Sequence, residues 1–217
     1  MDGVMHIVSV LTAPWCGWTM LVLLLCAVLA EFFQPGVITQ APAAVFARTD
    51  RTYKESPANF MGQLMITLFR IGTLALALCL CLCSINHVHF VAFWAICGII
   101  VAVLMVKMLL NVLLDYTFFL SRRFGSAYEA YGNIVTTGTV VLYPVMMILM
   151  HVSNPLAVQG TIAALAILFL CAWMFRAVRT YVVSPASVFY LVLYIATLEV
   201  LPMALIFYLS AKTIRFI

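Results

Sequence analysis

The chain carries very little charge for its length. Only 8% of its 217 residues are charged, 66% are hydrophobic, and the mean hydropathy is +1.18. Because soluble domains carry about 25% charged residues, water cannot be the main solvent of this chain. Lipid offers no hydrogen-bond partner to a backbone N–H or C=O, so long apolar stretches must form helices rather than the short alternating strands of a barrel. The composition predicts an all-α, polytopic transmembrane helical bundle.

The motifs that mark common enzymes are also missing. The sequence contains no HExxH, GxSxG, P-loop or GxGxxG pattern. Its net charge of +4 arises from cations scattered over the ends of apolar stretches, and nucleic-acid binding requires a patch of them. No Lys or Arg precedes Trp15, so the positive region of a cleavable signal peptide is absent. We therefore expect neither catalysis nor nucleic-acid binding, and we expect the first apolar stretch to be retained.

Cysteine and histidine are present without a metal-binding pattern. The 7 cysteines lie almost wholly within apolar stretches, where Cys behaves as a small hydrophobic residue. The four histidines all fall on one predicted side of the membrane: His6, His87, His89 and His151. Imidazole suits zinc, copper and haem iron, but neither cysteines nor carboxylates accompany these residues at ligand spacing. We expect no cofactor, and a haem or metal site at His87, His89 and His151 is the alternative.

Six apolar stretches are long enough to cross the bilayer, which takes about 17 to 25 helical residues. They are Trp15–Phe33, Phe60–Cys83, Val88–Leu120, Ile134–Met150, Leu156–Phe175 and Ala186–Ser210. The third stretch exceeds this requirement, so it must tilt or emerge from the bilayer. No charged or Ser/Gly-rich linker divides the chain. Residues 1–217 are therefore predicted to form a single transmembrane domain.

The basic residues predict the orientation of this domain. Seven of them follow the first, third and fifth stretches: Arg48, Arg51, Lys54, Arg122, Arg123, Arg176 and Arg179. The opposite side carries only Lys212 and Arg215. Because short cytoplasmic loops collect Lys and Arg, both termini are predicted to be non-cytoplasmic. A half-inserted segment near residues 37–46 would instead invert the first stretch.

A few polar residues lie where lipid is expected. Lys107, Asn111 and Asp115 follow one another at i, i+4 and i+8, so they share one helical face that must meet protein or water. Arg70 and Lys107 are predicted to lie at a depth similar to that of Glu199. A charge inside the bilayer costs about 2.5 to 3.5 kcal/mol on insertion scales, so Glu199 is predicted to pair with Lys107 or with Arg70.

Two prolines lie inside predicted spans and are candidate helix kinks. Pro144 falls in the fourth stretch and Pro202 in the sixth. A proline ring clashes with the carbonyl four residues earlier, so Pro202 is expected to free the Leu198 carbonyl beside Glu199. The polar cluster and its kink have two interpretations. They are structural contacts between helices, or they conduct protons or substrate.

Two sequence patterns resemble a known family. One is the basic run Arg48–Ser56 with the apolar stretch that follows, and the other is the spacing of Tyr194, Glu199 and Pro202 in the last stretch. Together with Lys107, these make residues 48–217 similar to the bacterial membrane-protein family called domain of unknown function 4271. The resemblance implies a multi-pass protein of the bacterial inner membrane, and it implies no activity.

Three function classes follow in order of preference. The first is a non-catalytic subunit or scaffold whose partners are the lipid bilayer and other membrane proteins. The second is a small transporter or proton-coupled protein that uses Glu199, Lys107 and Arg70. The third is a membrane enzyme or haem carrier. An apolar outer groove would favour the first class, whereas a water-filled cavity that reaches Glu199 would favour the second.

Overall fold

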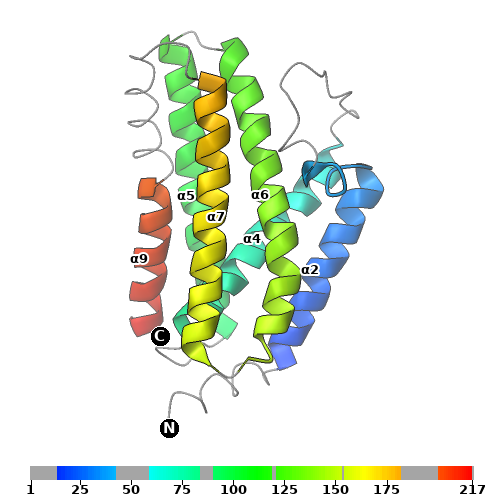
Figure 1. Ribbon diagram of the computed structural model, residues 1–217, viewed down its shortest axis with the longest axis vertical. Coiled ribbons are helices and arrows are strands. Elements are labelled where there is room, and N and C mark those ends of the chain that lie inside the picture. The colour runs from blue at the N-terminus through cyan, green and yellow to red at the C-terminus, as the bar shows by residue number, and fades with distance from the viewer. Residues whose placement is uncertain are drawn as a thin grey trace.

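The computed structural model describes residues 14–42, 59–83, 90–118, 121–152, 154–181 and 200–216. These residues form an all-helical bundle (Figure 1). Its helices are α2 (Pro14–Phe33), α4 (Phe60–Cys83), α5 (Phe90–Phe118), α6 (Ser121–Leu149), α7 (Pro155–Tyr181) and α9 (Leu201–Phe216). The predicted fold class is confirmed, and α4 has the same bounds as the second predicted span.

Five of these helices are long and apolar enough to cross a membrane. Their apolar segments are Trp15–Phe33, Phe60–Leu82, Phe90–Leu110, Gly132–Leu149 and Leu156–Phe175. Helix α9 adds a shorter apolar segment, Leu201–Ile214. The sixth predicted span begins at Ala186, which lies outside the described residues. The protein is thus a multi-pass membrane protein with about five spans.

Three helices are longer than a bilayer crossing requires, and α5 ends, α6 begins and α7 ends at the same end of the bundle (Figure 1). Helices α5 and α6 have 29 residues each and α7 has 27, which at about 1.5 Å per residue exceeds the roughly 30 Å of hydrocarbon. In α6 and α7 the surplus includes polar turns, which lie before Gly132 and after Phe175. The long third span therefore emerges from the apolar layer. Arg122 and Arg123 lie in the first turn of α6, where the sequence had predicted a loop.

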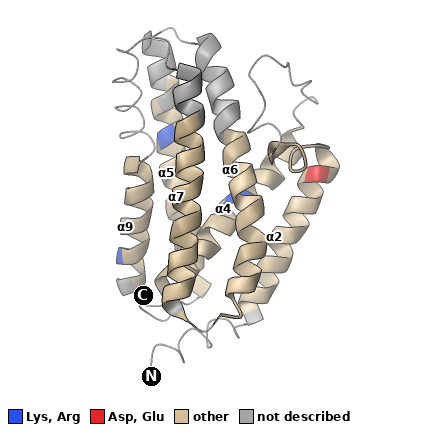
Figure 2. Ribbon diagram, viewed as in Figure 1, with Lys and Arg blue, Asp and Glu red and all other residues tan. Residues whose placement is uncertain are grey.

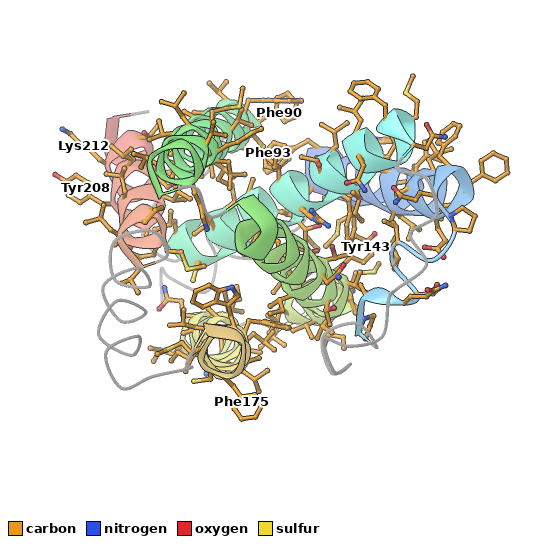
Figure 3. All side chains as sticks on the ribbon, turned by 90° about the horizontal axis from the view of Figure 1, so that it is seen from above. Phe90, Phe93, Tyr143, Phe175, Tyr208 and Lys212 are labelled. Carbon is orange, nitrogen blue, oxygen red and sulfur yellow. The ribbon has the colours of Figure 1, made fainter. Side chains whose placement is uncertain are left out.

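Helix α4 is the centre of the bundle. It contacts α2, α5, α6, α7 and α9, and half of its apolar segment is buried, against 6% for α7. Small residues allow this close approach: Ala75 is fully buried, and a Cβ on Gly72 would come within 2.3 Å of Cδ2 of Leu23 on α2. Seen from above, α4 runs obliquely across the bundle between α5 and α6 (Figure 3).

Helix α2 is part of the core. Its residues Cys16 and Met20 belong to the main buried cluster, and Leu23 and Ala30 form a second cluster with α4. The hydroxyl of Tyr143 on α6 donates a hydrogen bond to the Met20 carbonyl at 3.0 Å. The first apolar stretch therefore completes the packing of the bundle.

The chain turns back tightly after α2. The carboxylate of Glu31 accepts hydrogen bonds from the backbone N–H groups of Gly36 and Ile38, each at 2.8 Å, and from the Thr39 hydroxyl at 2.9 Å. Gly36 has a φ of 94°, a conformation that suits glycine. The turn brings Val37 and Ile38 against the second core cluster. Helix α2 ends and α4 begins at the same end of the bundle (Figure 1), so these two helices are antiparallel.

Candidate functional site

The predicted polar cluster is only partly described. Arg70 lies on α4 and Lys107 on α5. Asn111 and Asp115 lie on α5, but their side chains are outside the described part of the structure, as is Glu199 altogether. The pairing of Glu199 therefore stays a prediction. Figure 2 shows how sparse charge is on the described helices, with cations on α4, α5 and α9 and an acidic residue at the end of α2.

Arg70 connects α4 to α6. Its Nη2 donates a hydrogen bond to Oγ1 of Thr136, and the Thr136 hydroxyl donates in turn to the Gly132 carbonyl at 2.8 Å. A Cβ on Gly132 would lie 4.0 Å from Nη2 of Arg70. Since the apolar segment of α6 begins at Gly132, the guanidinium reaches the boundary of the apolar layer. Long basic side chains reach such boundaries by extending their aliphatic stems through apolar surroundings.

The partner of Arg70 belongs to a polar face of α6 that sequence reasoning missed. Gly132, Thr136, Thr139 and Tyr143 recur at helical spacing, so they line one side of the helix. Both threonines are buried, and Oγ1 of Thr139 bonds the carbonyls of Val135 and Thr136 at 3.0 and 2.9 Å. Tyr143 points into the bundle (Figure 3). The sequence signal that could have revealed this face is the run of small and hydroxylated residues within 132–139, inside an apolar stretch.

Thr73 is a buried polar residue on α4, three positions after Arg70. Its side chain is 1% exposed, and its hydroxyl has no hydrogen-bond partner. Ser210 on α9 is also buried, and its hydroxyl likewise has no hydrogen-bond partner. A buried hydroxyl without a partner costs free energy, because it has left water and gained nothing in return. The hydroxyl of Thr136 is therefore expected to stabilise the fold, whereas the hydroxyl of Thr73 is expected to destabilise it.

Lys107 lies at a different helix interface. It borders a crevice of about 190 Å³ between α5 and α9, and its side chain is only 9% exposed. The crevice walls are Ala102, Val103, Val106, Lys107 and Leu110 of α5 with Leu201, Pro202 and Leu205 of α9. Among the described residues of these walls, Lys107 is the only charged one. The two candidate partners of Glu199 are thus separated, with Arg70 against α6 and Lys107 beside α9.

The two prolines occupy different positions in their helices. Helix α6 continues through Pro144, whose ring nitrogen cannot donate to the Val140 carbonyl. Pro202 is the second residue of α9, and Val200 just before this helix is itself in a π-helical conformation. The kink predicted at Pro202 depends on residues 182–199, which lie outside the described ranges.

One of the four histidines is described. His151 is exposed in the turn after α6, and its Nδ1 lies 2.9 Å from the Met147 carbonyl. His6, His87 and His89 lie outside the described residues. Within the ranges that the structure describes, no three His, Cys, Asp or Glu side chains are grouped to hold a metal. The expectation of no cofactor stays a prediction.

Comparison with known families identifies the chain. The family described as Domain of unknown function (DUF4271) matches residues 17–209, from the first turn of α2 into α9. The chain belongs to the DUF4271 family. The predicted resemblance began at Arg48, and the DUF4271 match adds nearly all of α2, in agreement with its place in the core. No curated protein and no solved structure matches the chain.

Proposed function

We propose that this DUF4271 protein is a non-catalytic subunit or scaffold of a membrane assembly. The observation that supports it is the use of Arg70, the ionisable residue on the central helix. Its guanidinium contacts Thr136 across the α4–α6 interface. In a membrane bundle such a contact between helices contributes about 0.6 to 2 kcal/mol, which serves packing without any turnover.

Two further polar contacts serve the same purpose. Tyr143 joins α6 to α2 through the Met20 carbonyl, and Nε2 of Gln159 on α7 donates to the Cys81 carbonyl of α4 at 3.1 Å. Hydrogen bonds between a side chain and another helix fix the register of packed helices where the hydrophobic effect is weak. These contacts support an interior built for rigidity, as a scaffold requires.

The outer surface supports partners within the membrane. Only 6% of the apolar segment of α7 is buried, and Phe175 at its end points away from the bundle (Figure 3). Large apolar side chains such as Leu156 and Ile167 are exposed along the same helix. Such a surface suits acyl chains or the apolar helices of another membrane protein.

The decisive experiment is purification of the tagged protein from native membranes after cross-linking at Cys171, an exposed cysteine on α7. The expected result is a stoichiometric membrane protein that is cross-linked and co-purified. A matched chain in which Cys171 is replaced by Ser should lose the cross-link and keep the co-purified partner. A protein that elutes alone in mild detergent, cross-linked to nothing, would contradict the proposal.

The alternative function is a small transporter or proton-coupled protein that uses Glu199, Lys107 and Arg70. Lys107 favours it, because a nearly buried cation beside a crevice is a functional candidate in a membrane. Liposomes that contain the protein and a pH-sensitive dye would test it. Proton flux that disappears in Glu199→Gln would establish the alternative, and the subunit proposal predicts no flux.

We also propose that the protein lies in the bacterial inner membrane with both termini non-cytoplasmic. The extended ends of α5, α6 and α7 support this orientation. Four arginines lie on the extensions of α6 and α7: Arg122, Arg123, Arg176 and Arg179. Positive residues next to spans are retained on the cytoplasmic side.

A further inference from the structure

The crevice between α5 and α9 opens on the outside of the bundle. Of its wall residues, Val106 is 57% exposed, Leu110 is 44% exposed and Leu201 is 64% exposed. In a bilayer these side chains face lipid, so the molecules that meet the crevice are lipids. Its volume of about 190 Å³ exceeds the roughly 150 Å³ of an apolar cavity that accepts benzene. The crevice therefore has room for a segment of an acyl chain.

The position of Lys107 adds a charge to this apolar wall. The apolar segment of α5 begins at Phe90, 17 residues before Lys107. At about 1.5 Å per residue, this places the backbone of Lys107 roughly 25 Å into an apolar layer of about 30 Å, which leaves about 5 Å to its far boundary. The long stem of a lysine spans such a distance, so its ammonium can meet the headgroup region.

We propose that the crevice is a binding site for an anionic phospholipid. One acyl chain lies against Ala102, Val103 and Leu205, and the phosphate accepts a hydrogen bond from the ammonium group of Lys107. An apolar wall alone does not distinguish one phospholipid from another, whereas a cation at the boundary favours negative headgroups. An ammonium group has more than one N–H donor, so binding a phosphate is compatible with other contacts of Lys107. The site is independent of the proposed assembly role.

The test uses the full-length protein in detergent with added phosphatidylglycerol and phosphatidylcholine in equal amounts. Native mass spectrometry then measures the ratio of the two lipids that remain bound. We expect phosphatidylglycerol to be retained preferentially. Lys107→Met should lower this preference about five-fold, the equivalent of the roughly 1 kcal/mol that one basic residue contributes at an anionic surface. Lys107→Arg should preserve it.

Two further variants separate the charge from the crevice. Lys212→Met removes an exposed cation of α9 that lies seven residues beyond Leu205, and it should leave the lipid ratio unchanged. Ala102→Phe fills the crevice from an exposed position that tolerates a larger side chain, and it should reduce retention of both lipids. This variant keeps the proposal testable if Lys107→Met fails to fold.

Three outcomes would overturn the proposal. They are equal retention of both lipids by the unaltered protein, an unchanged ratio in folded Lys107→Met, and unchanged retention in folded Ala102→Phe. Palmitate added in competition with phosphatidylglycerol tests whether the anionic ligand is a free fatty acid. If palmitate displaced phosphatidylglycerol through Lys107, the ligand would be a free fatty acid and the phospholipid assignment would be wrong.

Discussion

Arg70 and Thr136 show how a basic residue is accommodated within an apolar helix. The hydroxyl of Thr136 accepts a hydrogen bond from Arg70 and donates one to the Gly132 carbonyl, so it serves as acceptor and donor at once. The guanidinium lies beside Gly132, where a Cβ would be 4.0 Å from Nη2, so this position does not crowd it. Because a hydrogen bond to a charged group is stronger than one between neutral groups, this contact is expected near the upper end of the range of about 0.6 to 2 kcal/mol for contacts between membrane helices.

The contrast between Thr136 and Thr73 gives a matched pair of variants. Thr136→Val removes the acceptor of a charged donor, so it should lower the free energy of unfolding by about 1 to 3 kcal/mol. Thr73→Val removes a buried hydroxyl that has no partner, so it should be neutral or stabilising by up to about 1 kcal/mol. Denaturant unfolding in one detergent measures both. Equal losses in the two variants would show that the hydrogen bond of Arg70 contributes nothing specific.

The partner of Glu199 is the second prediction at this scale. Arg70 and Lys107 lie at different interfaces, so Glu199 is expected to couple strongly to one of them and weakly to the other. Breaking a buried pair leaves one charge uncompensated, and Glu199→Gln or substitution of its partner by Met should each destabilise by about 3 to 5 kcal/mol at most. Double-mutant cycles with Lys107→Met and with Arg70→Met measure the coupling. Strict additivity in both cycles would show that the pairing does not exist.

Charge and hydroxyl groups differ in how readily the sequence reveals them. Arg70 and Lys107 stand out because any charge in an apolar stretch is costly and requires an explanation. Thr136 and Thr139 have intermediate hydropathy, so they do not interrupt an apolar stretch. Only packing shows that both are buried and that Thr136 faces α4. The interfaces that Arg70 and Lys107 occupy were not predictable either, because they depend on how the oblique α4 is packed.

Among the helices, α4 depends most on small residues. Gly72 faces Leu23 of α2 so closely that any side chain must displace it, and Leu23 is itself a core residue. Gly98 of α5 offers a matched control, because a Cβ there meets nothing within 4 Å. Comparing the same substitution at Gly72 and at Gly98 therefore separates the effect of packing from that of helix propensity.

This pair of glycines yields the prediction for the helices. Gly72→Leu should destabilise the bundle by about 1 to 3 kcal/mol through overpacking. Gly98→Leu should be neutral or slightly stabilising, because glycine in a helix costs about 0.5 to 1 kcal/mol relative to alanine. Thermal unfolding followed by size-exclusion chromatography of each variant measures the effect. A Gly72→Leu protein as stable as Gly98→Leu would contradict the close packing of α2 on α4.

Helix bounds were predictable where lipid determines them. The fourth predicted span, Ile134–Met150, differs from the apolar segment Gly132–Leu149 by two residues at one end and one at the other. The start of α6 at Ser121 was not predictable from hydropathy. Hydropathy indicates whether a segment lies in lipid or in water, but it does not indicate that the mostly polar residues 121–131 are helical. The central position of α4 depends on tertiary packing, which no single stretch reveals.

In the whole molecule, the helices alternate in direction, so α2 begins and α9 ends at the same end of the bundle (Figure 1). Trp15 and Phe90 meet at this end with their rings 5.8 Å apart, and Trp94 packs on Phe90 at 6.1 Å. Aromatic residues are enriched where the apolar layer meets water. The other end carries the helical extensions and their arginines. One end of the bundle thus carries aromatic residues and the other carries arginines, as a fixed orientation in the membrane requires.

This asymmetry leads to the prediction for the whole molecule. Single cysteines at Thr52, Ser126 and Ser184, in a background without the 7 native cysteines, should resist an impermeant thiol reagent applied to intact cells and react once the cells are opened. Asn154→Cys, in the exposed turn before α7, should react in intact cells. Ser126 lies six residues before Gly132, about 9 Å beyond the apolar segment, so lipid does not protect it and only sidedness decides its labelling. Labelling at Thr52, Ser126 and Ser184 in intact cells, with protection at Asn154, would reverse the orientation and place both termini in the cytoplasm.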